Sequence, residues 1–389
     1  MFRGIHMIYK KLGKSGLNAS IVGLGCEHLE GKEFEIVDQV VKAALECKIN
    51  IFDVFMSEPN VRTNIGKAIE GNRDKVILQG HIGSTFVDGQ YHRSRNIGQV
   101  KLFFEDFMTR LRTDYVDIGM IHFVDTDEDY DSVFSTDIIK YAIELKNQGK
   151  IKAIGLSSHA PSVALKAIKT GLIDVLMFSI NPAFDLLPED IKLDDLFIKD
   201  TYENKSLFGI DPIRAELYST CEQMDVGITV MKSLSAGLLL NADLSPFGQA
   251  MSVHQCMHYA LTRPGVSSVL VGCRSQEEVF EAASYINKSS EERDYTTILA
   301  QTPKYSNMGQ CMYCNHCLPC PSKIDIASVT KYLDLAIISG ENIPASVIEH
   351  YRAMATNADD CIECGNCEPN CPFNVEIIEN MRKAKEIFK

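Results

Sequence analysis

Short apolar segments rich in β-branched residues alternate with amphipathic segments from about residue 20 to residue 286. The apolar segments have the length and composition of β-strands. They are residues 19–25, 49–54, 75–80, 114–122, 151–158, 173–180, 227–233 and 266–272. Eight strand-helix repeats predict a parallel sheet closed into a (β/α)8 TIM barrel of the α/β class. The alternative, a doubly wound sheet, is less favoured because no G-x-G-x-x-G follows the first strand.

The segments between the strands place apolar residues at helical spacing. The clearest of them are residues 33–48, 99–112, 137–149 and 213–224. Gly149 is expected to close one helix, and Ser275 to open another as part of a capping box with Glu278. The barrel is expected to occupy residues 1–295, with a polar linker at residues 287–310.

A long acidic insertion, residues 181–211, follows the sixth predicted strand. Loops in this position build the active sites of barrels, so the insertion is a candidate lid. A small α-helical domain is expected over residues 296–389, with two helices between its cysteine runs and a third at the end of the chain.

Eight of the thirteen cysteines lie in two runs near the end of the chain. The first run is Cys311-x2-Cys314-x2-Cys317-x2-Cys320-Pro321, and the second is Cys361-x2-Cys364-x2-Cys367-x3-Cys371-Pro372. Both resemble the bacterial ferredoxin pattern, although the first has one residue fewer before its last cysteine. In that pattern three thiolates of a run hold one [4Fe–4S] cluster and the fourth holds the other.

The pattern therefore implies two [4Fe–4S] clusters with shared ligands. One set is Cys311, Cys314, Cys317 and Cys371, and the other is Cys361, Cys364, Cys367 and Cys320. Structural zinc is the main alternative, but it would leave the two Cys-Pro pairs without a reason. Disulfides would need a secreted setting.

The net charge of −13 and the pI near 5.3 argue against a general affinity for nucleic acid or acidic membrane surfaces. No run of 18 apolar residues and no apolar leader is apparent. We therefore expect a cytoplasmic protein with neither nucleic acid nor membrane as a partner. Iron–sulfur clusters and five further cysteines fit a reducing, anaerobic interior.

Several segments match one known family. They are MIYKKLGKSGLNASIVGLGC, FDV of the second strand, TDYVDIGMIHF, GKIKAIGLSSH, ELYSTCEQMDVGITVMKSLSAGLL and VLVGCRSQEEV. Together they resemble an aldo-keto reductase barrel, and the C-terminal part resembles the ferredoxin-like extension of one branch of that family. The resemblance implies a nicotinamide cofactor, NADP(H) or NAD(H), and an Asp, Tyr, Lys and His tetrad that reduces carbonyls.

Only half of the tetrad is present. Asp53 and His122 match its aspartate and histidine, whereas Glu58 stands in the tyrosine's place and His81 in the lysine's. Tyrosine gives the proton to the developing alkoxide and the lysine lowers its pKa, so their loss should cost at least about a hundredfold in ordinary carbonyl reduction. The candidate catalytic residues are Asp53, Glu58, His81 and His122.

The cofactor positions are mixed. Ser157 stands where the family binds the nicotinamide amide, and Lys232 where it lines the cofactor groove. Gly272, Arg274 and Ser275 precede a predicted helix and suit a phosphate. The family's adenine-contacting asparagine, however, falls at Ala282.

The leading hypothesis is an iron–sulfur oxidoreductase acting on a small carbonyl or hydroxy substrate in the barrel. The two clusters relay electrons, and a ferredoxin or flavodoxin is the candidate electron partner. The alternatives are a redox-neutral lyase or isomerase with structural clusters, a metal-dependent hydrolase and a non-catalytic electron-transfer subunit.

Overall fold

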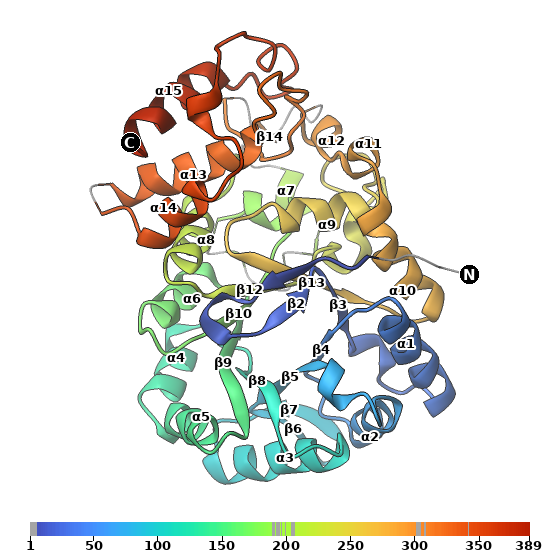
Figure 1. Ribbon diagram of the computed structural model, residues 1–389. Coiled ribbons are helices and arrows are strands. Elements are labelled where there is room, and N and C mark those ends of the chain that lie inside the picture. The colour runs from blue at the N-terminus through green and yellow to red at the C-terminus, as the bar shows by residue number, and fades with distance from the viewer. Residues whose placement is uncertain are drawn as a thin grey trace. The chain divides into compact units, whose positions relative to one another are not determined.

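The computed structural model describes residues 6–188, 191, 195, 197–198, 200–203, 207–300, 305–306, 309–340 and 342–389 (Figure 1). The chain folds into two compact units. The first contains Met1–Ile180, Val226–Ser233 and Val266–Lys288, and the second contains Asn181–Asp225, Leu234–Gly265 and Ser289–Lys389. The domain boundary expected between residues 295 and 296 stays a prediction.

In the described part of the first unit, eight parallel strands close into a barrel, which confirms the predicted fold. The strands are β3 (Val22–Gly25), β4 (Ile51–Val54), β5 (Ile77–Ile82), β8 (Val116–Ile121), β9 (Ile151–Ser158), β10 (Val175–Ser179), β12 (Gly227–Met231) and β13 (Val266–Gly272). Their order around the barrel is β10-β12-β13-β3-β4-β5-β8-β9. Seven of the predicted strand segments contain one of these strands, and the segment 75–80 overlaps β5, which extends two residues further.

The register places chemically active side chains at one edge of this barrel. Asp53 of β4 pairs with Gln79 of β5, and His81, two residues further along β5, pairs with Met120 of β8. His122 directly follows β8. Because parallel strands all end at the same edge, Asp53, His81 and His122 gather there.

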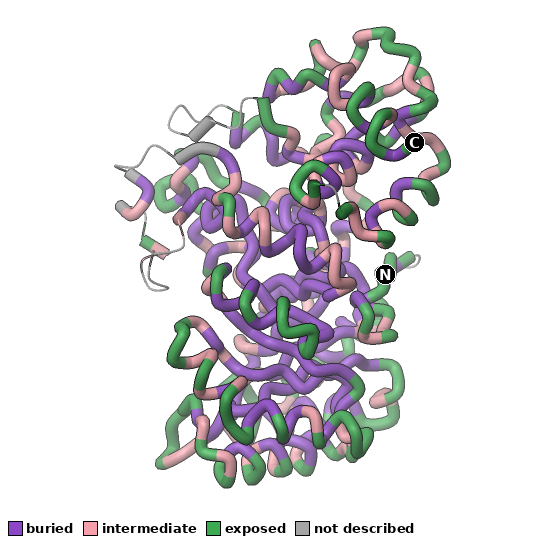
Figure 2. The backbone as a smooth tube through the Cα atoms, turned by 90° about the vertical axis from the view of Figure 1, so that its left-hand side faces the viewer, coloured by how far each residue is buried: buried purple, intermediate pink, exposed green. Residues whose placement is uncertain are grey.

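Amphipathic helices surround the barrel strands of the first unit (Figure 1). They are α1 (Phe34–Glu46), α2 (Pro59–Ala68), α3 (Ile97–Arg110), α4 (Asp127–Phe134), α5 (Asp137–Asn147), α6 (Pro161–Ile168) and α10 (Gln276–Ala283). Helix α1 packs against α2 and α10. Figure 2 shows the central strands as buried and the outward turns of the helices as exposed.

Two predicted helix ends are confirmed and one detail differs. Gly149 follows α5 with a left-handed φ of 71°, and Ser275 is the N-cap of α10. The side chain of Glu278, however, accepts the backbone N–H of Arg274 instead of that of Ser275, at 2.6 Å. The capping box expected here is therefore only half formed.

Two hairpins have no counterpart among the predicted elements. Strand β1 (Tyr9–Lys11) pairs antiparallel with β2 (Asn18–Ser20), so the segment expected as one strand at 19–25 is split into β2 and β3. Leu12 and Ala19 of this hairpin belong to the apolar cluster inside the barrel. The hairpin thus buries apolar surface that the barrel strands alone would leave open.

The second hairpin follows β5 and pairs β6 (Ser84–Val87) with β7 (Gln90–Arg93). Its two turn residues, Asp88 and Gly89, both have left-handed φ, 51° and 77°. This is the two-residue turn that matches the twist of hairpin strands.

The second unit is mainly helical. Its helices are α7 (Asp200–Glu203), α8 (Pro212–Gln223), α9 (Val253–Leu261), α11 (Ser290–Arg293), α12 (Thr296–Ala300), α13 (Ile326–Ser339), α14 (Ala345–Arg352) and α15 (Ile377–Ile387), and β11 (Leu207–Phe208) pairs with β14 (Tyr305–Ser306). The two helices expected between the cysteine runs, α13 and α14, and the final helix α15 are confirmed. Much of the acidic insertion expected as a lid lies outside the described residues.

A buried carboxylate organises the start of this unit. Asp185 is inaccessible to solvent and accepts hydrogen bonds from the hydroxyls of Tyr218 on α8, at 2.5 Å, and Tyr259 on α9, at 2.8 Å. Arg214 lies 3.6 Å from the same carboxylate and supplies a compensating charge.

Among the described residues, no helix is both long and apolar enough to cross a membrane.

Gly66 allows α2 to approach the end of α3 closely. A Cβ at this position would lie 2.7 Å from the Cα of Leu111 and would also clash with the carbonyl oxygen of Arg110. Both obstacles are backbone atoms, which cannot move aside as a flexible side chain would. We therefore predict that Gly66→Ala lowers the free energy of unfolding by about 1–3 kcal/mol, by overpacking.

Urea unfolding of the intact protein, followed by circular dichroism, would measure this loss. Gln39→Ala is the matched control, because Gln39 is exposed in the middle of α1 and should change the stability by less than about 0.5 kcal/mol. Equal stability of Gly66→Ala and Gln39→Ala would contradict the close helix approach.

Candidate active site and cluster cavities

Three of the four candidate catalytic residues form a buried hydrogen-bonded chain. Oδ1 of Asp53 lies 2.9 Å from Nε2 of His81, and Nδ1 of His81 lies 2.7 Å from Nδ1 of His122. All three residues are at most 5% exposed. Burial strengthens such hydrogen bonds and makes an unpaired polar atom costly, so the chain should be well ordered.

The Asp53 carboxylate also accepts a hydrogen bond from a neighbouring strand. The amide of Gln79 donates to Oδ1 of Asp53 at 2.8 Å, and Thr229 of β12 donates to the amide oxygen of Gln79 at 3.2 Å. Neither Gln79 nor Thr229 was among the sequence candidates. Their strand positions facing the barrel interior were the only available signal.

The chain has a fourth member that the sequence analysis missed. The hydroxyl of Tyr91, on strand β7, lies 2.6 Å from Nε2 of His122. The signal that could have found it is the Asp88-Gly89 pair, which is typical of a two-residue hairpin turn and places Tyr91 just beyond a barrel strand.

The partners determine which ring nitrogens carry protons. With Asp53 as a carboxylate, His81 donates through Nε2, so its Nδ1 must accept from Nδ1 of a neutral His122. Nε2 of His122 is then free to accept the hydroxyl proton of Tyr91. All hydrogen bonds of the chain therefore point in one direction, from Tyr91 to Asp53.

The surroundings of His122 favour its neutral form. Phe55 stacks on the His122 ring with centroids 6.0 Å apart. Burial, together with the neighbouring His81 and Arg95, lowers the pKa of His122 well below its ordinary value. An imidazolium at this position is disfavoured at neutral pH.

Glu58 lies apart from this chain. Its carboxylate caps α2 and accepts the backbone N–H groups of Asn60 at 2.9 Å and Val61 at 2.6 Å. The side chain that stands in the tyrosine's place is therefore engaged in capping the start of α2.

The candidate cofactor residues are partly engaged with their own chain. Ser157 is buried and accepts the backbone N–H of Phe123 at 2.8 Å, which fixes the chain just after His122. Lys232 follows β12, and its Nζ lies 4.0 Å from a carboxylate oxygen of Glu27. Gly272 ends β13, where a Cβ would lie 2.9 Å from the ring of His28.

The N-terminus of α10, expected as a phosphate site, already has an internal anion. Ser275 caps the helix through Glu278 N, and the Glu278 carboxylate takes the backbone N–H of Arg274. A phosphate at this point would have to displace that carboxylate.

The cysteines of the second unit line two cavities. The first cavity, of about 310 Å³, is lined by three cysteines of the first run and the last cysteine of the second. They are Cys311, Cys314, Cys317 and Cys371. Three contributions from one run and one from the other match the sharing implied by the ferredoxin pattern.

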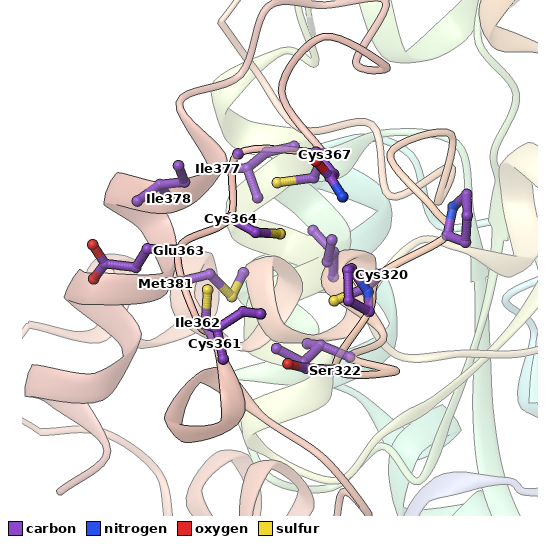
Figure 3. Close-up of a pocket in the computed structure, with 16 residues that line it drawn as sticks. Cys320, Ser322, Cys361, Ile362, Glu363, Cys364, Cys367, Ile377, Ile378 and Met381 are labelled. Atoms are coloured by element: carbon purple, nitrogen blue, oxygen red, sulfur yellow. The ribbon is translucent and has the colours of Figure 1, made fainter.

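The second cavity, of about 400 Å³, has the reciprocal composition (Figure 3). Its cysteines are Cys320, Cys361, Cys364 and Cys367. Ile326 and Ile377, the first residues of α13 and α15, line both cavities. Apolar side chains and four thiols per cavity fit an iron–sulfur cluster, which needs thiolate ligands and a shielded setting.

The backbone follows the same path through the two cysteine runs. Residues flanking the second cysteine of each run have left-handed φ: Tyr313 and Asn315 in the first, Glu363 and Gly365 in the second. Alternating right- and left-handed residues form backbone N–H concavities that bind anions, including iron–sulfur clusters. Both cavities therefore have a backbone suited to a negatively charged cluster.

The spacing of the side chains bears on the zinc alternative. Among the described residues, no group of three His, Cys, Asp or Glu side chains could hold a single metal ion. What favours a cluster over one zinc ion is the composition of the two cavities, because each is lined by three cysteines of one run and the last cysteine of the other, as the ferredoxin pattern implies.

Comparisons with known proteins agree with both parts of the chain. The family model described as "Aldo/keto reductase family" matches residues 22–198, and the model described as "4Fe-4S dicluster domain" matches residues 307–376. An uncharacterized oxidoreductase of Bacillus subtilis, YqkF, is 28% identical over 287 residues, which cover 70% of this chain and 89% of that protein. The aldo-keto reductase YhdN of Bacillus subtilis is 24% identical over 332 residues, 76% of this chain and 95% of its own.

Among solved structures, the holo form of aldo-keto reductase AKR11C1 from Bacillus halodurans has a similar fold. Its TM-score is 0.59 at 22% identity, over 74% of this chain and 94% of that one. This similarity supports the barrel fold alone. Residues 22–198 of the chain are thus similar to the aldo/keto reductase family, and residues 307–376 to 4Fe-4S dicluster domains.

Proposed function

We propose that this protein is an iron–sulfur oxidoreductase that acts on a small carbonyl or hydroxy substrate at the mouth of the barrel, with electrons relayed by two [4Fe–4S] clusters. The observation that carries the proposal is the position of His81, which stands in place of the family's lysine and bonds both Asp53 and His122. Proton-handling groups are therefore retained while the usual proton donor and its activating lysine are lost.

The buried chain suits proton transfer to or from a substrate oxygen. His122 is held neutral, so a proton can pass through the chain by exchange between ring nitrogens without a stable imidazolium. Asp53, bound by His81 and Gln79, is the inner end at which such a proton would rest.

The clusters would be held by the two sets of cysteines that line the cavities. Cys311, Cys314, Cys317 and Cys371 form one set, and Cys320, Cys361, Cys364 and Cys367 form the other. Bound clusters supply one-electron transfer at low potential. The chain's own contribution is to shield them and to provide backbone N–H groups near their sulfur atoms.

Two sources of electrons fit the proposal, a nicotinamide, NAD(H) or NADP(H), and a ferredoxin or flavodoxin. The internal bond from Arg274 to Glu278 at the expected phosphate position favours the protein partner. Titration with NADH and NADPH, followed through the cluster absorbance, would distinguish the two sources.

The proposal is tested by asking whether a substrate takes electrons from the clusters. The anaerobically purified protein is reduced with dithionite, freed of excess reductant and mixed with a panel of small aldehydes, ketones and hydroxy acids. We expect the cluster absorbance to recover with at least one carbonyl compound, and His122→Asn to slow that recovery by about a hundredfold or more.

Clusters that stay reduced with every compound in the panel would contradict electron transfer to a carbonyl substrate. Conversion of a compound with no change in the clusters would instead favour a redox-neutral reaction. Gln39→Ala is the matched control, because Gln39 is exposed on α1, outside the hydrogen-bonded chain, and its clusters should be reoxidised at the parent's rate.

The sharing of ligands between the cysteine runs leads to a second prediction. Cys371→Ser should remove the cluster held by Cys311, Cys314 and Cys317, and Cys320→Ser should remove the other. Iron would fall from about eight to about four atoms per chain in each variant, because each retains one [4Fe–4S] cluster. Iron analysis and electron paramagnetic resonance of the reduced proteins would show which cluster remains.

Cys47→Ala is the matched control, because Cys47 is buried after α1 and lies in neither cavity. It should keep the full iron content. If Cys371→Ser and Cys320→Ser gave the same remaining signal, the exchange of the fourth ligand would be wrong.

The lowered pKa of His122 predicts a pH dependence of stability. Below the ordinary histidine pKa of about 6.5, an unfolded His122 binds a proton that the folded state does not. The unfolded state then binds more protons, so stability falls as the pH drops below about 6.5 and is recovered above it. His122→Asn should flatten this part of the dependence.

Urea unfolding between pH 5 and pH 8, under anaerobic conditions, would measure it in both proteins. His254→Asn is a suitable comparison, because His254 is another buried histidine, on α9, without a place in the chain. An unchanged slope in His122→Asn would indicate that His122 already carries a proton in the folded state.

A further inference from the structure

The Tyr91 hydroxyl is hydrogen-bonded to the ring nitrogen of His122 that does not contact His81. Nε2 of His122 is 2.6 Å from the Tyr91 hydroxyl, and its other nitrogen is bonded to His81. Both nitrogens of His122 are therefore engaged by other side chains of the protein.

The hairpin that carries Tyr91 is fixed to the backbone around His122. Arg95 donates through Nη2 to the carbonyl oxygens of His122, at 3.0 Å, and Phe123, at 2.8 Å. Arg93 donates to the same Phe123 carbonyl at 3.0 Å and to the Asp129 carboxylate at 2.7 Å. These bonds hold the strand of Tyr91 at a defined position over the histidine.

The first strand of the hairpin is anchored separately. Ser84 donates its hydroxyl to the carbonyl oxygen of Phe55 at 2.5 Å, and Phe55 stacks on the His122 ring. Phe86 pairs with Tyr91 across the hairpin. Contacts on both strands make the Tyr91–His122 bond a property of the fold and not of one flexible side chain.

Exposure distinguishes Tyr91 from the other members of the chain. Tyr91 is 45% exposed, whereas Asp53, His81 and His122 are at most 5% exposed. Of these four residues, only Tyr91 is open to a molecule from solvent. The hydrogen-bonded chain thus connects a partly exposed tyrosine with a buried carboxylate.

We propose that Tyr91 is the catalytic acid–base that exchanges a proton with the substrate oxygen, and that His122, His81 and Asp53 relay that proton to and from the interior. The inference rests on the proposed function and assigns the missing tyrosine's task to a residue from a different loop.

The proton balance follows from the direction of the hydrogen bonds. In oxidation, the substrate hydroxyl gives its proton to Tyr91 while the Tyr91 proton passes to Nε2 of His122. The Nδ1 proton of His122 passes to His81, and the Nε2 proton of His81 passes to Asp53. One proton is thereby moved from the substrate to the carboxylate. The two electrons and the proton of the substrate C–H bond would go together, as hydride, to an oxidised nicotinamide. With the oxidised clusters as acceptors, the electrons would leave one at a time and the proton would be released to solvent.

Carbonyl reduction is the reverse sequence. Asp53 starts protonated, every hydrogen bond of the chain points outward, and Tyr91 protonates the oxygen as the carbon receives the electron pair and its proton. The same residues therefore serve both directions, as microscopic reversibility requires.

The charges around Tyr91 take over part of the lysine's role. Burial raises the pKa of Tyr91, and the guanidinium groups of Arg93 and Arg95 oppose that rise. The family's lysine acts on its tyrosine in the same sense. Two arginines of the hairpin thus provide positive charge that the barrel strand no longer supplies.

The decisive variants separate the two nitrogens of His122. An asparagine amide can replace Nδ1, so His122→Asn should keep the contact with His81 and lose that with Tyr91. A glutamine amide can reach the position of Nε2, so His122→Gln should keep Tyr91 and lose His81. Tyr91→Phe removes only the hydroxyl.

The hydrogen bond is tested without a substrate by fluorine NMR of protein labelled with 3-fluorotyrosine, with Tyr91→Phe assigning the resonance. We expect His122→Asn to lower the titration midpoint of Tyr91 by at least about half a pH unit, because a bond that favours the neutral hydroxyl is lost. His122→Gln should change it less. Tyr9, which is 47% exposed and donates to the Lys48 carbonyl, is the internal control and should not move.

The catalytic role is tested by reoxidation of the dithionite-reduced protein with glyceraldehyde and with the carbonyl compounds that are active in the panel. Tyr91→Phe, His122→Asn and His122→Gln should each slow the reaction by about a hundredfold or more, and Tyr9→Phe should not. The pH profile of the residual rate in Tyr91→Phe should lose the limb that reports the tyrosine.

The outcomes separate this inference from the proposed function. A Tyr91 resonance that is unaffected by His122→Asn would overturn the relay whatever the activity. A Tyr91→Phe variant as fast as the parent, or faster, would show that Tyr91 only covers His122. If no compound reoxidises the parent clusters while the Tyr91 resonance responds to His122→Asn, the proposed function fails and the relay stands.

Discussion

One proton shared between His81 and His122 determines the other hydrogen bonds of the candidate site. Two Nδ1 atoms 2.7 Å apart can form a hydrogen bond only if one is protonated and the other is not. Once Asp53 is a carboxylate, that requirement fixes both tautomers and makes Nε2 of His122 an acceptor. Tyr91 meets the requirement from outside the barrel with a hydroxyl that can donate.

The absence of the family's tyrosine at position 58 and the absence of its lysine at position 81 can be explained together. The tyrosine of the family depends on the lysine for its lowered pKa, so loss of the lysine leaves a tyrosine at position 58 with little purpose. His81 stands where the resemblance places the lysine, and its two ring nitrogens bond Asp53 and His122. Glu58, at the position expected for the tyrosine, caps α2 instead.

The barrel could be predicted from the sequence because its signals are local. Each strand is a short β-branched run and each helix an amphipathic one, and the parallel arrangement then places every strand end at one edge. Asp53, His81 and His122 are strand-end residues, so their meeting followed from the fold. The distances and tautomers that join them did not, because they depend on side-chain rotamers.

Tyr91 was missed for a physical reason. It lies on a four-residue strand within what the sequence presents as a polar connection between a barrel strand and its helix. Only the Asp88-Gly89 turn marks the hairpin, and nothing local indicates that its tip returns over His122. That return depends on Arg93 and Arg95 bonding backbone carbonyls about thirty residues away, which a reading of local periodicity does not detect.

The two groups of cysteines, unlike Tyr91, could be predicted from the sequence. The ferredoxin pattern implied the grouping of cysteines that lines the two cavities, although the first run is one residue shorter between its third and fourth cysteines. Backbone geometry explains why that difference is tolerated. In each run the residue three places after the last cysteine, Lys323 or Asn374, has left-handed φ, and a helix begins three residues later, at Ile326 or Ile377. The missing residue therefore falls in the segment that passes from one cavity to the other, where its absence changes neither the turn nor the helix that lines both cavities.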